Sequence, residues 1–182
     1  MNPLLRSTLI KVALPLIGIV IPMVVAKLRG FELRDFFGLH KPKMRAFAVA
    51  LALWIAWMAI TELVLHALGQ GAPDAWPDYP ASIVLLRVLA IGILGPIAEE
   101  LIFRGVIYGR IAPKLGPWIA IVLIAIVFGL IHTRYDAAII AVVTIDGLLF
   151  GIARYKTGSV YTPIAMHMLG NLFSVCQSLR LL

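Results

Sequence analysis

Long apolar runs separated by short polar segments dominate the pattern of side chains along the chain. A transmembrane helix needs about 20 mostly apolar residues to cross roughly 30 Å of hydrocarbon. Six runs approach or meet this length, and we expect each to form a membrane-spanning helix: residues 8–26, 44–68, 82–109, 117–132, 137–153 and 159–179. The pattern therefore predicts an all-α fold, a polytopic bundle of about six transmembrane helices in which residues 1–182 form a single membrane domain.

The segments between these runs carry the signals of loops and of the membrane interface. Residues 69–74 are rich in glycine and contain a proline, which predicts a loop between the second and third helices. Residues 31–43 mix aromatic side chains and leucine with basic residues, a composition typical of a segment lying at the membrane surface. The first run resembles a signal peptide, but Lys27 and Arg29 follow it directly, so we expect a retained helix.

Composition and charge agree with a membrane protein. Hydrophobic residues make up 62% of the chain and charged residues 14%, whereas soluble domains are nearer half apolar and a quarter charged. The net charge of +7 does not indicate a nucleic-acid partner, because the basic residues cluster in the short segments between apolar runs. The single cysteine, Cys176, excludes an intrachain disulfide.

Basic residues are distributed unequally between the two ends of the predicted bundle. Ten lie at one end: Lys27, Arg29, Arg34, Lys41, Lys43, Arg45, Arg110, Lys114, Arg154 and Lys156. Four lie at the other: Arg6, Lys11, Arg134 and Arg180. Because short cytoplasmic loops carry the excess of Lys and Arg, we expect the first end to face the cytoplasm and both termini to be external, in a prokaryotic inner or plasma membrane.

The third run contains charged residues that packing alone does not explain. A charge at the bilayer centre costs about 2.5–3.5 kcal/mol on insertion scales and persists mainly where it has a function. Glu100 and Arg104 are four residues apart, so they share a helix face and can neutralise each other. Glu99 lies about 100° around the helix from Glu100 and is left as the free carboxylate. Arg87, near the outer end of the run, is expected to extend its charge toward the membrane surface.

Two further pairs are spaced one helical turn apart and therefore share a helix face: Phe128 with His132, and His167 with Asn171. Measured from the basic end at about 1.5 Å per residue, Glu99 and His132 are expected roughly 16 and 22 Å deep, and His167 and Asn171 roughly 12 and 18 Å deep. The glutamate, both histidines and the asparagine therefore fall in one layer near the middle of the membrane.

Such a set of side chains supports hydrolysis. A carboxylate or an imidazole takes a proton from water as general base, and a histidine and an asparagine amide donate to the oxyanion that forms on an attacked carbonyl. The chain has no His-Glu-x-x-His zinc motif, and we expect no cofactor. A zinc ion held by Glu99, His132 and His167, with one open position, is the alternative.

Three sequence motifs lie on separate predicted helices in the order Glu99-Glu100-x-x-x-Arg104, Phe128-x-x-x-His132 and His167-x-x-x-Asn171. They resemble the motifs of the CAAX prenyl endopeptidase type II and bacteriocin-processing family, also called the CPBP or Abi family. The resemblance covers residues 82–175, which would form the catalytic core.

This resemblance implies glutamate-dependent intramembrane proteolysis. Glu99 and His132 would activate the water, and His167 and Asn171 would stabilise the oxyanion. The remaining motif residues would be supporting: Glu100, Arg104 and Phe128. Asp146, midway along the fifth run, either orients a catalytic histidine or Arg104, or makes a plain hydrogen bond between helices.

Two other functions fit part of the pattern. A non-catalytic immunity or scaffold protein of the same fold has no evident need for an unpaired Glu99. A proton-coupled transporter uses buried acids and histidines as a relay, but the chain shows no internal repeat of the kind found in such transporters. We therefore predict an intramembrane endopeptidase whose partners are the lipid bilayer and a membrane-delivered protein or peptide substrate.

Overall fold

The computed structural model describes residues 1–69, 75–76 and 78–181, and its regular structure within these ranges is entirely helical. The loop predicted at residues 69–74 lies, apart from its first residue, outside the described residues. In chain order, the α-helices are α1 (Pro3–Leu28), α2 (Leu33–Phe37), α3 (Met44–Ala67), α4 (Ala81–Arg87), α5 (Gly95–Glu100), α6 (Tyr108–Leu115), α7 (Pro117–Leu130), α8 (Ala137–Thr157) and α9 (Tyr161–Ser178). The predicted all-α fold is confirmed.

Helices α4, α5 and α6 belong to one continuous helical rod, Ala81–Leu115. Two π-helical stretches, η1 (Val88–Leu94) and η2 (Leu101–Ile107), interrupt its α-helical geometry on either side of α5. A π-helix bonds each N–H to the carbonyl five residues back instead of four, and such stretches are frequent at functional sites. The short α5 between them carries both candidate glutamates.

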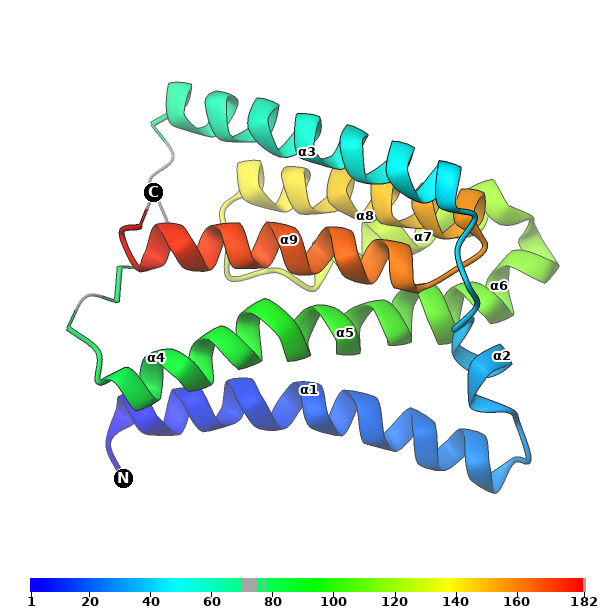
Figure 1. Ribbon diagram of the computed structural model, residues 1–182, viewed down its shortest axis with the longest axis horizontal. Coiled ribbons are helices and arrows are strands. Elements are labelled where there is room, and N and C mark those ends of the chain that lie inside the picture. The colour runs from blue at the N-terminus through cyan, green and yellow to red at the C-terminus, as the bar shows by residue number, and fades with distance from the viewer. Residues whose placement is uncertain (70–74, 77, 182) are drawn as a thin grey trace.

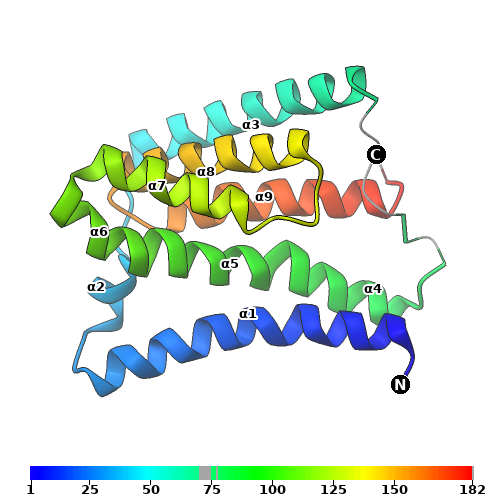
Figure 2. The same ribbon diagram turned by 180° about the vertical axis from the view of Figure 1, so that it is seen from behind.

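The long helices lie side by side along the long axis of the molecule (Figure 1). The α4–α6 rod runs between α1 and α9, and α3 covers α8 and α9 at the edge opposite α1. Helices α7 and α8 form a back layer, which Figure 2 shows from its own side. Both termini lie at one end of the bundle, whereas α2 and α6 lie at the other. This second end is the one where the basic residues gather.

Within the described residues, four helical segments are long and apolar enough to cross a membrane: α1, α3, the α4–α6 rod and α8. Helix α7 has 14 residues and α9 has 18, and both run alongside the other four (Figure 1). Four long helices and two shorter ones thus agree with the prediction of about six spans. The predicted end of the fourth run was wrong, because α7 ends at Leu130 and His132 lies beyond it.

Arg87, which we expected to extend its charge toward the membrane surface, is held by contacts inside the protein. Its side chain is buried and donates to Thr8 Oγ1 at 3.1 Å and to Ser7 Oγ at 3.0 Å. The hydroxyl groups in the first turns of α1 offer acceptors inside the protein, so the charge is stabilised without leaving the bundle.

Close packing of α8 against the rod positions the buried polar residues. A Cβ built on Gly147 would lie 3.1 Å from Cα of Ala125 and 3.2 Å from Nη2 of Arg104. A larger residue at this position would force α7 or the Arg104 side chain to shift by a few tenths of an ångström. One turn further along α8, Trp54 of α3 packs against Phe150 with ring centroids 4.8 Å apart, in a buried apolar cluster that joins α3, α8 and α9.

Candidate active site

Glu100 and Arg104 form a fully buried ion pair on one face of the α4–α6 rod. Their side chains are 0% and 1% exposed, and Arg104 Nη1 donates to Glu100 Oε1 at 2.9 Å. Arg104 Nη2 also donates to the carbonyl of Gly147 at 2.9 Å, and the guanidinium carbon lies 4.5 Å from the centre of the Phe128 ring. The pairing expected from the spacing of four residues is therefore present, with an aromatic face and a backbone dipole as further support.

His167 contacts the same carboxylate. Its Nδ1 lies 3.0 Å from Glu100 Oε1, and since an ionised carboxylate only accepts, Nδ1 is the donor. The imidazole stacks on Phe150 at 5.0 Å and meets the edge of Phe128 at 5.9 Å. Glu100 thus holds both Arg104 and His167, a link that sequence reasoning missed, and the hydrogen bond leaves Nε2 as the imidazole nitrogen free for chemistry.

Glu99 faces that free nitrogen. Its Oε2 lies 4.0 Å from His167 Nε2, and the Glu99 side chain keeps 35% of its surface exposed. Oε2 itself is buried without a hydrogen-bond partner among the described residues. A carboxylate oxygen and an imidazole nitrogen at this separation are too far apart for a direct hydrogen bond and can be bridged by one water molecule.

Asn171 follows His167 by one turn of α9, and its amide is partly committed to the backbone. Asn171 Nδ2 donates to the carbonyl of Ile91 at 2.8 Å. This carbonyl has lost its helical donors, because the N–H of Gly95 bonds to Ala90 in the π register and Pro96 has no N–H. Asn171 therefore replaces the missing backbone donor and retains one further N–H.

His132 lies beyond the end of α7 and, like His167, packs against the Phe128 ring. Its Nδ1 lies 2.7 Å from the carbonyl of Phe128, which can only accept, so Nδ1 is again the donor and Nε2 is free. The His132 ring centre is 5.0 Å from that of Phe128. The structure shows no direct hydrogen bond between His132 and Glu99.

Asp146 makes the plainer of its two expected contacts. Its Oδ1 accepts a hydrogen bond from Trp57 Nε1 at 2.7 Å, which links α8 to α3.

No group of three or more histidine, cysteine or acidic side chains with metal-binding geometry occurs within residues 1–69, 75–76 and 78–181. Glu99, His132 and His167, the residues of the zinc alternative, do not form such a group.

Comparison with known proteins assigns the segment that contains this site. Residues 80–173 match the family model described as Type II CAAX prenyl endopeptidase Rce1-like. Over 138 residues the chain is 29% identical to the Membrane-embedded CAAX protease MroQ of Staphylococcus aureus, covering 70% of this chain and 55% of that protein. No solved structure matches the chain.

Two further proteins match shorter parts of the chain. The chain is 31% identical over 97 residues to the Bacillus subtilis protein named "Putative membrane peptidase YdiL", covering 53% of this chain and 39% of that protein. It is 30% identical over 88 residues to an uncharacterized 24.3 kDa protein of Escherichia coli, covering 47% and 41%. The matched segments span about two-fifths to one-half of these relatives. The family model covers more than half of the present chain and all three motifs, and the chain belongs to the Rce1-like family of type II CAAX prenyl endopeptidases.

Proposed function

We propose that this chain is a glutamic-type intramembrane endopeptidase that cleaves a membrane-delivered protein or peptide with an activated water. The observation that carries the proposal is the Glu99 carboxylate, which has a buried unpaired oxygen 4.0 Å from His167 Nε2. A buried carboxylate oxygen without a hydrogen-bond partner among the described residues costs free energy, and a role in activating water gives a reason for it that a scaffold or immunity function lacks. Residues 82–175 would form the catalytic core.

In the proposed mechanism, Glu99 takes a proton from a water held between it and the histidines. His132 helps to activate this water through Nε2, the nitrogen that its bond to the Phe128 carbonyl leaves free to accept a hydrogen bond. As the water attacks, the uncommitted N–H of Asn171 and the Nε2–H of His167 in its imidazolium form, which the Glu100 carboxylate stabilises, donate to the oxyanion. The C–N bond of the substrate then breaks, and the proton held by Glu99 passes to the leaving amine. The second carboxylate, Glu100, keeps the His167 ring oriented through Nδ1.

Asn171 provides the test that separates this mechanism from a zinc-dependent one, because amides are poor zinc ligands but good donors to an oxyanion. We expect Asn171→Ala to lose about 10²–10³ in single-turnover cleavage rate, with substrate binding largely kept. The same variant leaves the Ile91 carbonyl without its donor, so stability is measured in parallel. Pro96→Ala/Asn171→Ala returns a backbone N–H to α5 and is expected to recover stability without activity.

The metal content of active, detergent-purified protein completes this test. We expect full cleavage without added metal and no stoichiometric zinc. One tightly bound zinc per chain, lost together with activity in Glu99→Ala, would overturn the proposal and make Glu99, His132 and His167 metal ligands. Recovery of activity by the Pro96→Ala/Asn171→Ala variant would show that Asn171 acts only on the backbone.

We also propose that the end containing α2 and α6 faces the cytoplasm and that both termini are external, from the ten-to-four excess of basic residues. A reporter fused after Lys43 should give a cytoplasmic signal and one fused at the C-terminus an external signal. The reverse at both sites would reject this orientation. The substrate class we propose is a protein delivered within the membrane, such as a bacteriocin leader, a C-terminal sorting signal or an anti-sigma-like protein.

A further inference from the structure

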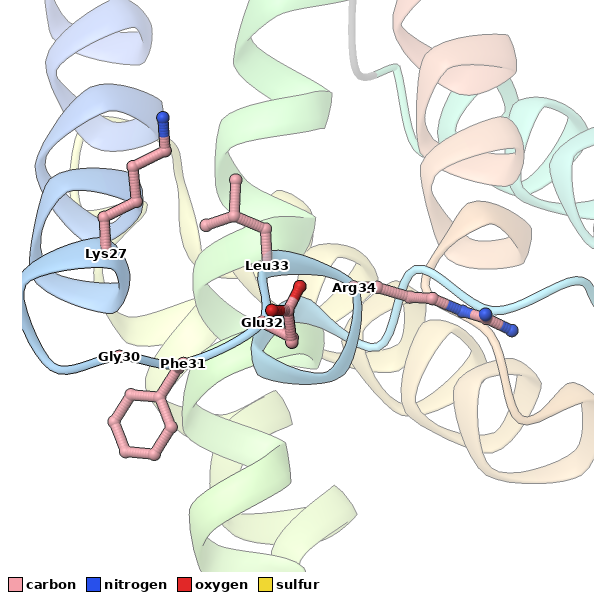
Figure 3. Close-up of a pocket in the computed structure, with 6 residues that line it drawn as sticks. All are labelled: Lys27, Gly30, Phe31, Glu32, Leu33 and Arg34. Carbon is pink, nitrogen blue, oxygen red and sulfur yellow. The ribbon is translucent and has the colours of Figure 1, made fainter.

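Two adjoining cavities lie around Leu33, at the basic end of the bundle where α1 passes into α2. One has a volume of about 410 Å³ and is lined by residues 27 and 30–34, with Lys27, Glu32 and Arg34 as its charged members (Figure 3). The other has a volume of about 300 Å³, and its exposed wall is entirely apolar. Leu33 lines both cavities. A charged compartment therefore meets an apolar one at a single side chain.

The charged compartment favours an anion. From residue 27 to residue 45 the chain has six basic and two acidic side chains. Among the residues that the structure describes, neither Lys27 nor Arg34 has a carboxylate within 4.0 Å. In Figure 3, Lys27 extends along α1 and Leu33 points in the same direction, between α1 and the neighbouring helical rod. The Lys27 ammonium is thus free to bind a ligand that reaches the same crevice.

The apolar compartment extends from Leu33 into the bundle. Its walls come from α1, α2, the rod and α9, and include Met23, Ile97 and Ile164. At about 100° per residue, Ile97 lies about 160° around the rod from Glu99. A ligand in this compartment therefore lies on the face of the rod opposite the candidate catalytic carboxylate and is not positioned for cleavage.

We propose that an anionic glycerophospholipid binds at this junction, with its phosphate against Lys27 and one acyl chain in the apolar cavity. A phosphate beside an alkyl chain matches a basic compartment joined to an apolar one, and basic side chains near the surface attract anionic lipid. Ile97 and Ile164 each lie three residues before a member of the Glu100–His167 pair. A bound chain would therefore brace α5 and α9, which hold that pair together.

The experiment compares lipid binding to the full-length protein in neutral detergent by native mass spectrometry and thermal unfolding. Phosphatidylglycerol and phosphatidylcholine with identical acyl chains are the probes. We expect a one-to-one complex with phosphatidylglycerol and a rise in the unfolding midpoint with its concentration, as for any ligand that binds only the folded state. Equal binding of both lipids would overturn the proposal, because it would show only bilayer-like solvation.

Three variants localise the site. Lys27→Gln should weaken phosphatidylglycerol binding about fivefold, and Met23→Trp should weaken it by filling the apolar cavity. The matched control is Lys114→Gln, which removes one lysine at the same end but lines neither cavity. Equal losses in the two charge variants would show diffuse attraction and contradict the proposal, as would undiminished binding to Met23→Trp.

Discussion

Two buried arginines of the same helical rod, Arg104 and Arg87, are stabilised in different ways. Arg104 is 1% exposed and is neutralised by Glu100, whose carboxylate accepts from it at 2.9 Å. Arg87 is 8% exposed and donates to the hydroxyl groups of Ser7 and Thr8. Among the described residues, no carboxylate lies within 4.0 Å of Arg87.

Aromatic rings complete both environments. The Arg87 guanidinium lies 5.4 Å from the ring centre of Trp76 and 5.0 Å from that of Tyr79, and that of Arg104 lies 4.5 Å from Phe128 and 5.3 Å from Phe150. The rings around Arg104 are also those that pack against His167. Glu100, Phe128 and Phe150 therefore both stabilise the Arg104 charge and contact the candidate catalytic histidine. The hydrogen bonds of Arg87 instead join α4 to α1.

Removal of the Arg104 charge should have the larger effect. Arg104→Met keeps the length of the side chain but leaves the buried Glu100 carboxylate without its charged partner, which typically costs about 3–5 kcal/mol. We expect little folded protein by fluorescence-detected size exclusion and a strongly lowered unfolding midpoint. Glu100→Gln/Arg104→Met should recover part of this loss, because no buried charge remains unpaired. Wild-type stability of Arg104→Met would show that the pair is not a structural element.

Removal of the Arg87 charge should cost less. Arg87→Met abandons two hydroxyl groups, and Thr8 Oγ1 still donates to the carbonyl of Leu4 at 2.9 Å, so the expected cost is about 1–2 kcal/mol. The cleavage rate per folded molecule should remain near that of the wild type. A loss of stability equal to that of Arg104→Met, measured in the same thermal unfolding assay, would remove the distinction between the two regions.

The apolar runs were enough to predict the helices, and a spacing of four residues within one helix was enough to predict the Glu100–Arg104 pair. The contact between Glu100 and His167, 67 positions apart, could not be predicted in this way. The depth of a residue along its helix does not define the direction in which its side chain points. Asn171 was expected to stabilise the oxyanion. Its hydrogen bond to the Ile91 carbonyl could not be predicted, because that bond depends on the π register of η1. Pro96, which removes a backbone donor in the middle of a span, was the available signal for an orphaned carbonyl. His132 lies outside α7 because the polar run at residues 132–136 ends the helix.

The central claim is that Glu99 accepts a proton from water, whereas Glu100 stabilises Arg104 and orients His167. Single-turnover cleavage of a membrane-anchored reporter peptide by purified, reconstituted protein tests this claim most directly. Glu99→Gln should fold and unfold like the wild type and show no cleavage, because an amide cannot take a proton from water. Glu100→Gln, the matched neighbour, should instead yield less folded protein, because Arg104 loses its charged partner. Cleavage by Glu99→Gln at the wild-type rate would contradict the account.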